Sequence, residues 1–516
     1  MSVIEIRNLS FTYEGSSEPV FDGVSFIIDS NWKLGFVGRN GKGKTTLLKI
    51  LLGECEYSGS LISSEVFQYF PRIIPEEKWD STADELIEEA YPGRESWRIL
   101  AEIDKLGMDA ELMYRPYRTL SFGERTRIQL ATLFSGDNEF LLIDEPTNHL
   151  DEETKEQIKK YLNSKKGFIL VSHDRDVLDA CTDHTLALNR SSIDVCKGNF
   201  SSWYENKEKR DHDEAVRNEA LLREIKQLEA SARKTREHAD SIESKKIGFD
   251  PVKDHDRSIA TRSYLGAKSK TLQSRVGSML ERQSRDIEEK KGLLKDIEKI
   301  SDLKLLPKQF RAGSIVRAKD MSIAYDGRII CRGIDFEIKS GDRVLLKGRN
   351  GSGKSSIIKA LLKQSRRYED PVLKKETENL SYEGELYLAP SAVISYCSQD
   401  TSFMKGTPAE YAEQNGIDKT LLFTILRKLD LERSLFESDI REFSEGQKKK
   451  TAIAASLSQS ADLYIWDEPL NYIDIYSRMQ IEKLLNTYKP TMLFVEHDSC
   501  FEEKIATLTV KTETVL

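Results

Sequence analysis

The chain has 516 residues, a formal net charge of −8 and six cysteines. At roughly 150 residues per unit, this length suggests about three structural units. No stretch approaches the ~18 apolar residues of a membrane span. The N-terminus lacks the pattern of a signal peptide, and the scattered cysteines form no CxxC pair. We therefore exclude an integral membrane protein and a disulfide framework, and we expect a cytoplasmic protein with reduced thiols.

Four motifs occur twice, in the same order. GRNGKGKT and GRNGSGKS begin at Gly38 and Gly348, 310 residues apart. LSFGE and FSEGQ, the two Asp-Glu-Pro boxes and the pair VSHD and VEHD repeat at offsets of 323 to 324. An internal repeat of this kind indicates duplicated structural units. The sequence predicts two α/β P-loop domains, at residues 1–203 and 313–516, with a segment of different character at 204–312.

Each copy opens with a strand, a glycine-rich loop and a helix. The motif G-x-x-x-x-G-K-[ST] in this context wraps backbone N–H groups around phosphates. Its lysine reaches the β- and γ-phosphates, and its hydroxyl ligates Mg²⁺. We therefore expect Thr45 and Ser355 at a metal ion, and ATP to be bound by Gly38, Asn40, Gly41, Gly43, Lys44, Thr45 and Thr46, and by Gly348, Asn350, Gly351, Gly353, Lys354, Ser355 and Ser356.

A buried strand ending in Asp-Glu follows in each copy. Asp144 and Asp467 are expected to hold Mg²⁺, and Glu145 and Glu468 to polarise the attacking water. A salt-bridged strand end is the alternative, but His173 and His497 follow at matching distances and would hold the γ-phosphate and the water in line.

A glutamine is expected to sense the metal and the water in each copy. Gln399 ends the strand-like segment AVISYCSQ, and Gln68 lies in EVFQYF. Their offset is 331, which predicts extra residues in the second copy, in the polar stretch 364–383.

Residues 204–312 have a helical composition, with 26 Lys or Arg against 21 Asp or Glu. Apolar positions from Leu221 to Ile242 step by four and three residues, as in a coiled-coil seam, and a weaker seam runs from Leu272 to Ile297. We expect two long antiparallel helices joined by a tip at about 246–265. A helix of about 40 residues would be about 60 Å long.

With the other motifs, LSFGE and FSEGQ resemble the ABC signature, so both terminal blocks resemble ABC ATPases. The resemblance implies that each signature binds the γ-phosphate held by the opposite domain. Ser444 and Gly446 would then complete the site at 38–45, and Ser121 and Gly123 the site at 348–355. It also implies that two aromatic residues stack on adenine, and these are Tyr13 and Tyr325.

The second copy departs from the family pattern. Phe443 replaces the usual Leu of the signature and Glu445 replaces a Gly, while DEPLNYID stands in place of DEPTNHLD. Glu445 puts a negative charge near a phosphate, which could slow the first site.

A helical hairpin between two complete domains resembles the ABC-F family, whose ATPases act on ribosomes. The long linker, the absence of an arm in the first domain or of a C-terminal extension, and the segment RSYLGAKSKTLQSR resemble its antibiotic-resistance group, the Lsa, Vga and Vml types. The resemblance implies a monomer without a membrane subunit. It would bind near the peptidyl-transferase centre with P-site tRNA and displace lincosamide, streptogramin A and pleuromutilin drugs.

The charge of the tip favours RNA as its partner. Residues 257–280 contain no Asp or Glu, and basic side chains neutralise phosphates. An exposed aromatic residue can stack on an unpaired base. A solvated helix face is the alternative. The tip residues that we expect at RNA or at the drug site are Phe249, Arg257, Arg262, Tyr264, Lys268, Lys270 and Arg275.

Other functions remain open from the sequence. A housekeeping ABC-F factor for stalled ribosomes would carry the same motifs. A tandem transporter ATPase could borrow membrane subunits from other chains, although it has no use for a long helical hairpin. A scaffold that only holds ATP is disfavoured by the two Glu/His pairs.

Overall fold

The computed structural model describes residues 2–15, 19–148, 150–189, 193–247, 313–365 and 377–512, with Lys374 and scattered residues between 274 and 310. The chain packs as two compact units. One unit contains residues 1–203 and 300–516, and the other contains residues 204–299. No helix among the described residues is both long enough and apolar enough to span a membrane.

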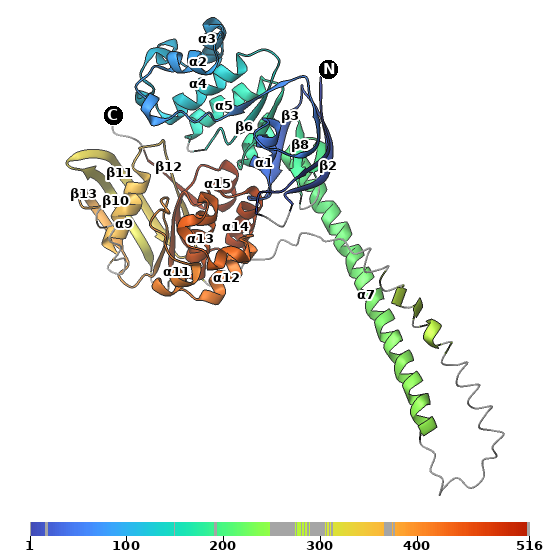
Figure 1. The fold of residues 1–516 in the computed structure, drawn as a ribbon. Helices are drawn as coiled ribbons and strands as arrows, with labels where there is room; N and C mark the ends of the chain where they lie inside the picture. The colour runs from blue at the N-terminus through green and yellow to red at the C-terminus, as the bar shows by residue number, and fades with distance from the viewer. Residues whose placement is uncertain are drawn as a thin grey trace, which may run out of the picture. The chain divides into compact units, whose positions relative to one another are not determined.

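The first copy is built on a six-stranded sheet (Figure 1). Five strands are parallel, and the sixth, β9, pairs antiparallel with β8. Val, Ile, Leu and Phe fill the central strands, as expected where both faces are buried. In sheet order the strands are β5 (Val66–Phe70), β6 (Glu139–Asp144), β7 (Phe168–Val171), β3 (Lys33–Gly38), β8 (His184–Leu188) and β9 (Ile193–Lys197).

A smaller antiparallel sheet and a set of helices complete this copy. The sheet has the order β2 (Phe21–Asp29), β1 (Val3–Phe11) and β4 (Ser58–Ile62). Its apolar residues share one core with β3 and with helix α1 (Lys44–Leu51). The other helices are α2 (Ala83–Ala90), α3 (Ser96–Lys105), α4 (Phe122–Phe134), α5 (Glu152–Asn163) and α6 (Arg175–Cys181).

The second copy repeats this plan. Its parallel sheet has the order β14 (Ile394–Cys397), β15 (Leu463–Asp467), β16 (Met492–Val495), β12 (Arg343–Lys347) and β17 (Leu508–Lys511). Its antiparallel sheet has the order β11 (Arg328–Lys339), β10 (Ser314–Tyr325) and β13 (Leu380–Leu388). The helices are α9 (Lys354–Gln364), α11 (Pro408–Gln414), α12 (Lys419–Lys428), α13 (Glu445–Ser458), α14 (Ile475–Tyr488) and α15 (Ser499–Ile505).

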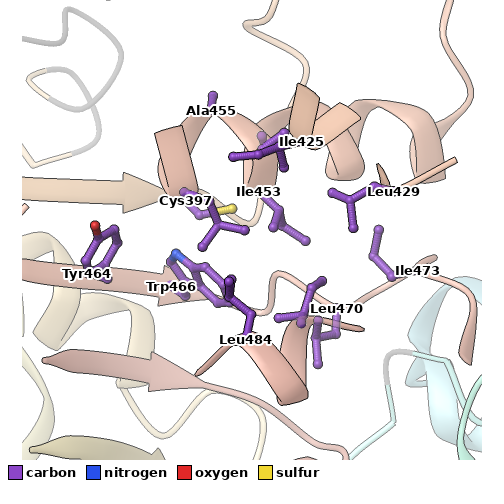
Figure 2. Close-up of a cluster of buried hydrophobic side chains, with 14 of the residues drawn as sticks. Cys397, Ile425, Leu429, Ile453, Ala455, Tyr464, Trp466, Leu470, Ile473 and Leu484 are labelled. Carbon is purple, nitrogen blue, oxygen red and sulfur yellow. The ribbon is translucent and has the colours of Figure 1, made fainter. Parts of the chain in front are cut away.

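A core in the second copy positions its Asp-Glu strand end. Figure 2 shows Trp466 of β15 among Cys397, Ile453 and Leu484, which come from a neighbouring strand and from helices. Trp466 is fully buried, and its indole N–H donates to Ser456 Oγ at 2.9 Å. Buried strands of this kind are rigid supports, so the residue that follows Trp466, Asp467, is held firmly at the strand end.

Helix α7 spans Phe200–Ile247, 48 residues, or about 72 Å at 1.5 Å per residue. This helix agrees with the first of the two predicted helices. Along its described side chains, Ile225 is buried and Leu221 and Leu228 are half-buried, while most of their neighbours are exposed. The predicted tip and most of the second helix lie outside the described residues.

Candidate ATP sites

Each glycine-rich loop lies between the first parallel strand and the helix that follows it. Gly43 and Gly353 precede α1 and α9 with φ of 104° and 90°, a conformation that favours glycine. A Cβ on Gly43 would lie 2.5 Å from a side-chain carbon of Val20. The backbone conformation of each loop therefore requires glycine at this position.

The P-loop lysines fold back onto their loops. Lys44 Nζ donates to the carbonyl of Gly38 at 2.7 Å and to Asn40 Oδ1 at 3.1 Å. Lys354 Nζ donates to the carbonyl of Gly348 at 2.8 Å. Burial lowers the pKa of both lysines. An ammonium group held inside a loop of backbone N–H groups suits a phosphate chain.

In the second copy, the proposed metal ligands are close together. The Ser355 hydroxyl lies near the Asp467 carboxylate and favours its ionised form, but burial outweighs this effect and raises the pKa of Asp467 to about 6. Asp467 Oδ1 is buried and has no hydrogen-bond partner among the described residues. A buried carboxylate oxygen beside a hydroxyl suits Mg²⁺, which prefers oxygen ligands and few protein groups. The residues therefore fit the ion.

Glu468 is held by two amide side chains and lies beside a histidine. Gln399 Nε2 donates to its Oε2 at 2.8 Å, and Asn471 Nδ2 donates to the same oxygen at 2.9 Å. His497 Nε2 lies 3.6 Å from the other carboxylate oxygen. Burial alone would raise the pKa of Glu468, but the hydrogen bonds and nearby positive charge outweigh burial and lower it. The carboxylate is therefore ionised at neutral pH, as a base requires.

These groups line a cavity of about 400 Å³. Its walls include Lys354, Glu468 and His497, and also Asn350, Gly351, Gly353, Ser355, Ser356 and Gln399. Most of the residues predicted for ATP in the second copy therefore surround one space.

The first copy has the same groups in a different network. Asp144 accepts a hydrogen bond from the Tyr69 hydroxyl at 3.0 Å, although burial raises the pKa of Asp144. Glu145 accepts from the backbone N–H of His173 at 3.3 Å, and His173 Nε2 lies 3.5 Å from Glu145 Oε1. Burial and the charge of Asp144 raise the pKa of Glu145 to about 8.

Both glutamates have a left-handed backbone, with φ of 51° at Glu145 and 46° at Glu468. This conformation is uncommon for residues other than glycine, and such strain tends to occur at functional sites. The same strain in both copies supports the hypothesis that these two residues are catalytic.

Gln68 does not lie at the metal site. It pairs with Leu141 in the parallel register of β5 and β6, and its side-chain amide donates to Glu139, at the start of β6, at 3.4 Å. Asp144 lies at the opposite end of that strand. The strand position of Gln68 corresponds to Ser395 in the second copy, and that of Gln399 corresponds to Arg72. The assignment of Gln68 is therefore wrong.

The second signature lies against the first P-loop. A Cβ on Gly446 would lie 3.2 Å from Asn40 Nδ2 and 2.8 Å from the carbonyl oxygen of Tyr472. Asn40 Nδ2 itself donates to that carbonyl at 2.8 Å. Ser444 is the N-cap of α13 and accepts from the N–H of Gln447. The geometry therefore brings Gly446 to the predicted loop, at the N-terminus of a helix where an anion is favoured.

Further contacts join the two copies. Arg39 pairs with Asp430, and Arg175 makes a buried bidentate pair with Glu482. Lys155 Nζ donates to the carbonyl of His497 at 2.8 Å.

At the second P-loop, Arg349 pairs with Glu153 of α5 at 2.6 Å. Ser121 caps α4 as Ser444 caps α13, but the nearest atoms to a Cβ on Gly123 belong to Thr154 and Leu150 of its own copy. Among the described residues, a signature glycine therefore lies against the P-loop of the opposite copy at the first site.

The two predicted adenine-stacking residues have different surroundings. Tyr13 is 49% exposed, and its hydroxyl hydrogen-bonds with Thr46 Oγ1 at 2.7 Å, beside the first P-loop. Tyr325 ends β10 and packs against the core of the antiparallel sheet. All seven predicted tip residues, from Phe249 to Arg275, lie outside the described residues.

Sequence reasoning missed Tyr69, Arg72 and Asn471. The signal was available in the two segments YFPR and YCSQ, which align Tyr69 with Tyr396 and Arg72 with Gln399. The choice of Gln68 followed residue type instead of strand position.

The fold and these sites define an ATPase with two nucleotide-binding domains. The family model described as ABC transporter matches residues 21–148 and 331–471, more than half of the chain. Ribosome protection protein VmlR of Bacillus subtilis (strain 168) is 26% identical over 510 residues, which cover 97% of this chain and 85% of that protein. ATP-binding protein Uup of Caulobacter vibrioides is also 26% identical, over 96% of this chain and 75% of its own length.

A solved structure of the archaeal ribosome recycling factor aABCE1, in complex with the stalk protein aP1, has a TM-score of 0.58 and 18% identity. It covers 98% of this chain and 87% of its own, and shows the same fold. The chain belongs to the ABC transporter family, and within it this protein is an ATPase of the ABC-F family. The predicted fold class and the predicted ATPase activity are thereby confirmed.

Proposed function

We propose that this ATPase binds the ribosome when ATP holds its two domains together, and that it protects the peptidyl-transferase centre from antibiotics. The observation that carries the proposal is its similarity, over 97% of the chain, to a protein named for ribosome protection.

The proposed ATP sites are composite. Site one joins the first P-loop to Ser444 and Gly446, and site two joins the second P-loop to Ser121 and Gly123. The contact of Gly446 with Asn40 supports site one. Since each γ-phosphate would be bound by both domains, ATP would stabilise their association and hydrolysis would release it.

The residues of each site have separate roles in hydrolysis. Mg²⁺, held by Asp467 and Ser355, would neutralise charge on the phosphates. Lys354 binds the β- and γ-oxygens, Glu468 orients and deprotonates the attacking water, and His497 holds the γ-phosphate and the water in line. In site one, the corresponding roles belong to Asp144, Thr45, Lys44, Glu145 and His173.

The tip of the 204–312 segment is proposed to act on the drug site. Helix α7, about 72 Å long, provides the reach. A tip that reshapes the RNA pocket would raise the free energy of the bound drug through its differential affinity for the two pocket shapes. Lincosamides, streptogramin A and pleuromutilins are the proposed drug classes.

Two measurements test the proposal. The double variant E145Q/E468Q with ATP should pellet with ribosomes, and binding should weaken as salt rises, because phosphate contacts release counterions. In a drug-sensitive bacterium, the intact protein should permit growth in lincomycin or tiamulin.

Variants of the tip separate binding from protection. Y264A, and more strongly deletion of residues 258–266, should abolish growth in the drug and leave ATP hydrolysis nearly intact. R262A and K268A should instead weaken ribosome pelleting. Full protection by the deletion variant would refute the role of the tip.

Two other outcomes identify the alternatives. Ribosome pelleting without drug protection would indicate a translation factor acting on stalled ribosomes. Recovery with membranes alone would favour a transporter ATPase.

A further inference from the structure

The two copies place different residues beside the Asp-Glu strand end. Tyr69 pairs with Leu142 in one sheet, and Tyr396 pairs with Ile465 at the matching position of the other. Three residues further along lie Arg72 in the first copy and Gln399 in the second. The position that follows the strand therefore carries a cation in one copy and an amide in the other.

In the second copy, this position supports the proposed base. Gln399 and Asn471 both donate to Glu468 Oε2, at 2.8 and 2.9 Å. Two donors on one oxygen fix the rotation of the carboxylate, and the other oxygen then lies beside His497. Gln399 acts through Glu468 and is a positioning residue.

In the first copy, Arg72 has other contacts. Its guanidinium lies over the Tyr91 ring, 5.5 Å from the centroid, and it lines a cavity of about 310 Å³ with residues of α2 and α4. Its backbone N–H and carbonyl bind the side chain of Gln129, each at 3.1 Å. These contacts hold the loop, so Arg72 takes no part in orienting Glu145.

The carboxylates that precede the two glutamates also differ. Asp467 lies near the P-loop hydroxyl of Ser355. Asp144 accepts from the Tyr69 hydroxyl at 3.0 Å, whereas the matching Tyr396 hydroxyl lies 3.4 Å from Ser398 Oγ. In the first copy, one oxygen of Asp144, the proposed metal ligand, is thus already hydrogen-bonded to the Tyr69 hydroxyl. Glu145 Oε1 is buried and has no hydrogen-bond partner among the described residues.

We infer that the two sites hydrolyse ATP unequally. Site two, where Gln399 holds Glu468, turns over. Site one, where Arg72 stands at the position of Gln399 and the Tyr69 hydroxyl binds Asp144, retains its ATP. The inference rests on the proposed ATP sites and assigns hydrolysis to one of them and stable ATP binding to the other. Retained ATP would keep the domains joined at site one while site two cycles.

The chemical step is the same wherever it occurs. The water oxygen attacks the γ-phosphorus, the bond from that phosphorus to the β–γ bridging oxygen breaks, and a water proton passes to the glutamate. ADP and inorganic phosphate leave. Because a misplacement of about 1 Å can cost up to ~100-fold in rate, the orientation of this carboxylate is sufficient to separate the sites.

The experiment compares single substitutions in the full chain. E468Q should lower steady-state ATP hydrolysis at least tenfold, and E145Q less than threefold. Q399A should lower kcat about tenfold with little change in KM, and Q399N, which keeps an amide donor on a shorter side chain, should recover part of the loss. Q68A is the matched control, because Gln68 lies outside the site, and its rate should equal that of the parent.

The bound nucleotide gives a second readout. After incubation with ATP and Mg²⁺ and rapid removal of free nucleotide, the parent should retain about one ATP per chain. R72Q places an amide where Gln399 stands in the other copy and should increase the ADP fraction at site one. This gain cannot come from damage to the fold.

Equal losses in E145Q and E468Q, or a parent that retains only ADP, would overturn the inference. Neither result would bear on the proposal that the protein binds ribosomes, because the pelleting assay measures that binding separately. Failure to pellet with ribosomes would refute the proposed function. It would not affect the inference that the two sites hydrolyse ATP at different rates.

Discussion

Substitution of Gly446 by alanine tests the composite site most directly. The added Cβ would lie 2.8 Å from the carbonyl oxygen of Tyr472, which is closer than real Cβ contacts, and 3.2 Å from Asn40 Nδ2. The same carbonyl accepts the hydrogen bond from Asn40 at 2.8 Å. One methyl group therefore forces the signature helix to shift and weakens the contact between the copies.

The free-energy cost of G446A follows from these two effects. Overpacking costs about 1–3 kcal/mol, and loss of the hydrogen bond costs about 0.5–1.5 kcal/mol. Together they amount to about 1.5–4.5 kcal/mol, so the Kd of ATP at site one should rise by between roughly tenfold and about a thousandfold.

The assay isolates site one. E145Q arrests hydrolysis there, and K354A removes nucleotide binding at the second P-loop. In this double-variant background, equilibrium dialysis should give one ATP per chain. G123A is the matched control, because its Cβ would lie 3.2 Å from the flexible side chain of Thr154 in its own copy. An ATP Kd within threefold of the background for G446A would refute the composite site.

Three further predictions concern the chemistry and the core. E145Q/E468Q should reduce Mg²⁺-dependent hydrolysis by well over tenfold while ATP still binds, because loss of a general base costs about 10²–10⁴ in rate; undiminished turnover would contradict both assignments. W466A should destabilise the second copy by about 3–5 kcal/mol, measured by thermal unfolding. The buried thiols of Cys181 and Cys397, whose pKa burial raises to about 12, should react with Ellman's reagent at pH 8 only after unfolding.

Local patterns were sufficient for much of this protein. The P-loop, the Asp-Glu strand end and the following histidine are contiguous motifs, so the sequence alone determined the two ATPase domains. Helix α7 was also predictable, because an apolar spacing of four and three residues is a local property of the chain.

The tertiary structure decided which residues meet. Gln68 and Arg72 lie four residues apart, and only the pairing of β5 with β6 shows which of them corresponds to Gln399. Strand register depends on partners far away in the sequence, and side chains alternate between the two faces of the sheet. The contact between Asn40 and Tyr472 is likewise made between the two copies, and no local pattern specifies it. The motifs therefore determined the chemistry of the sites, and the packing of distant segments decided how the two sites differ.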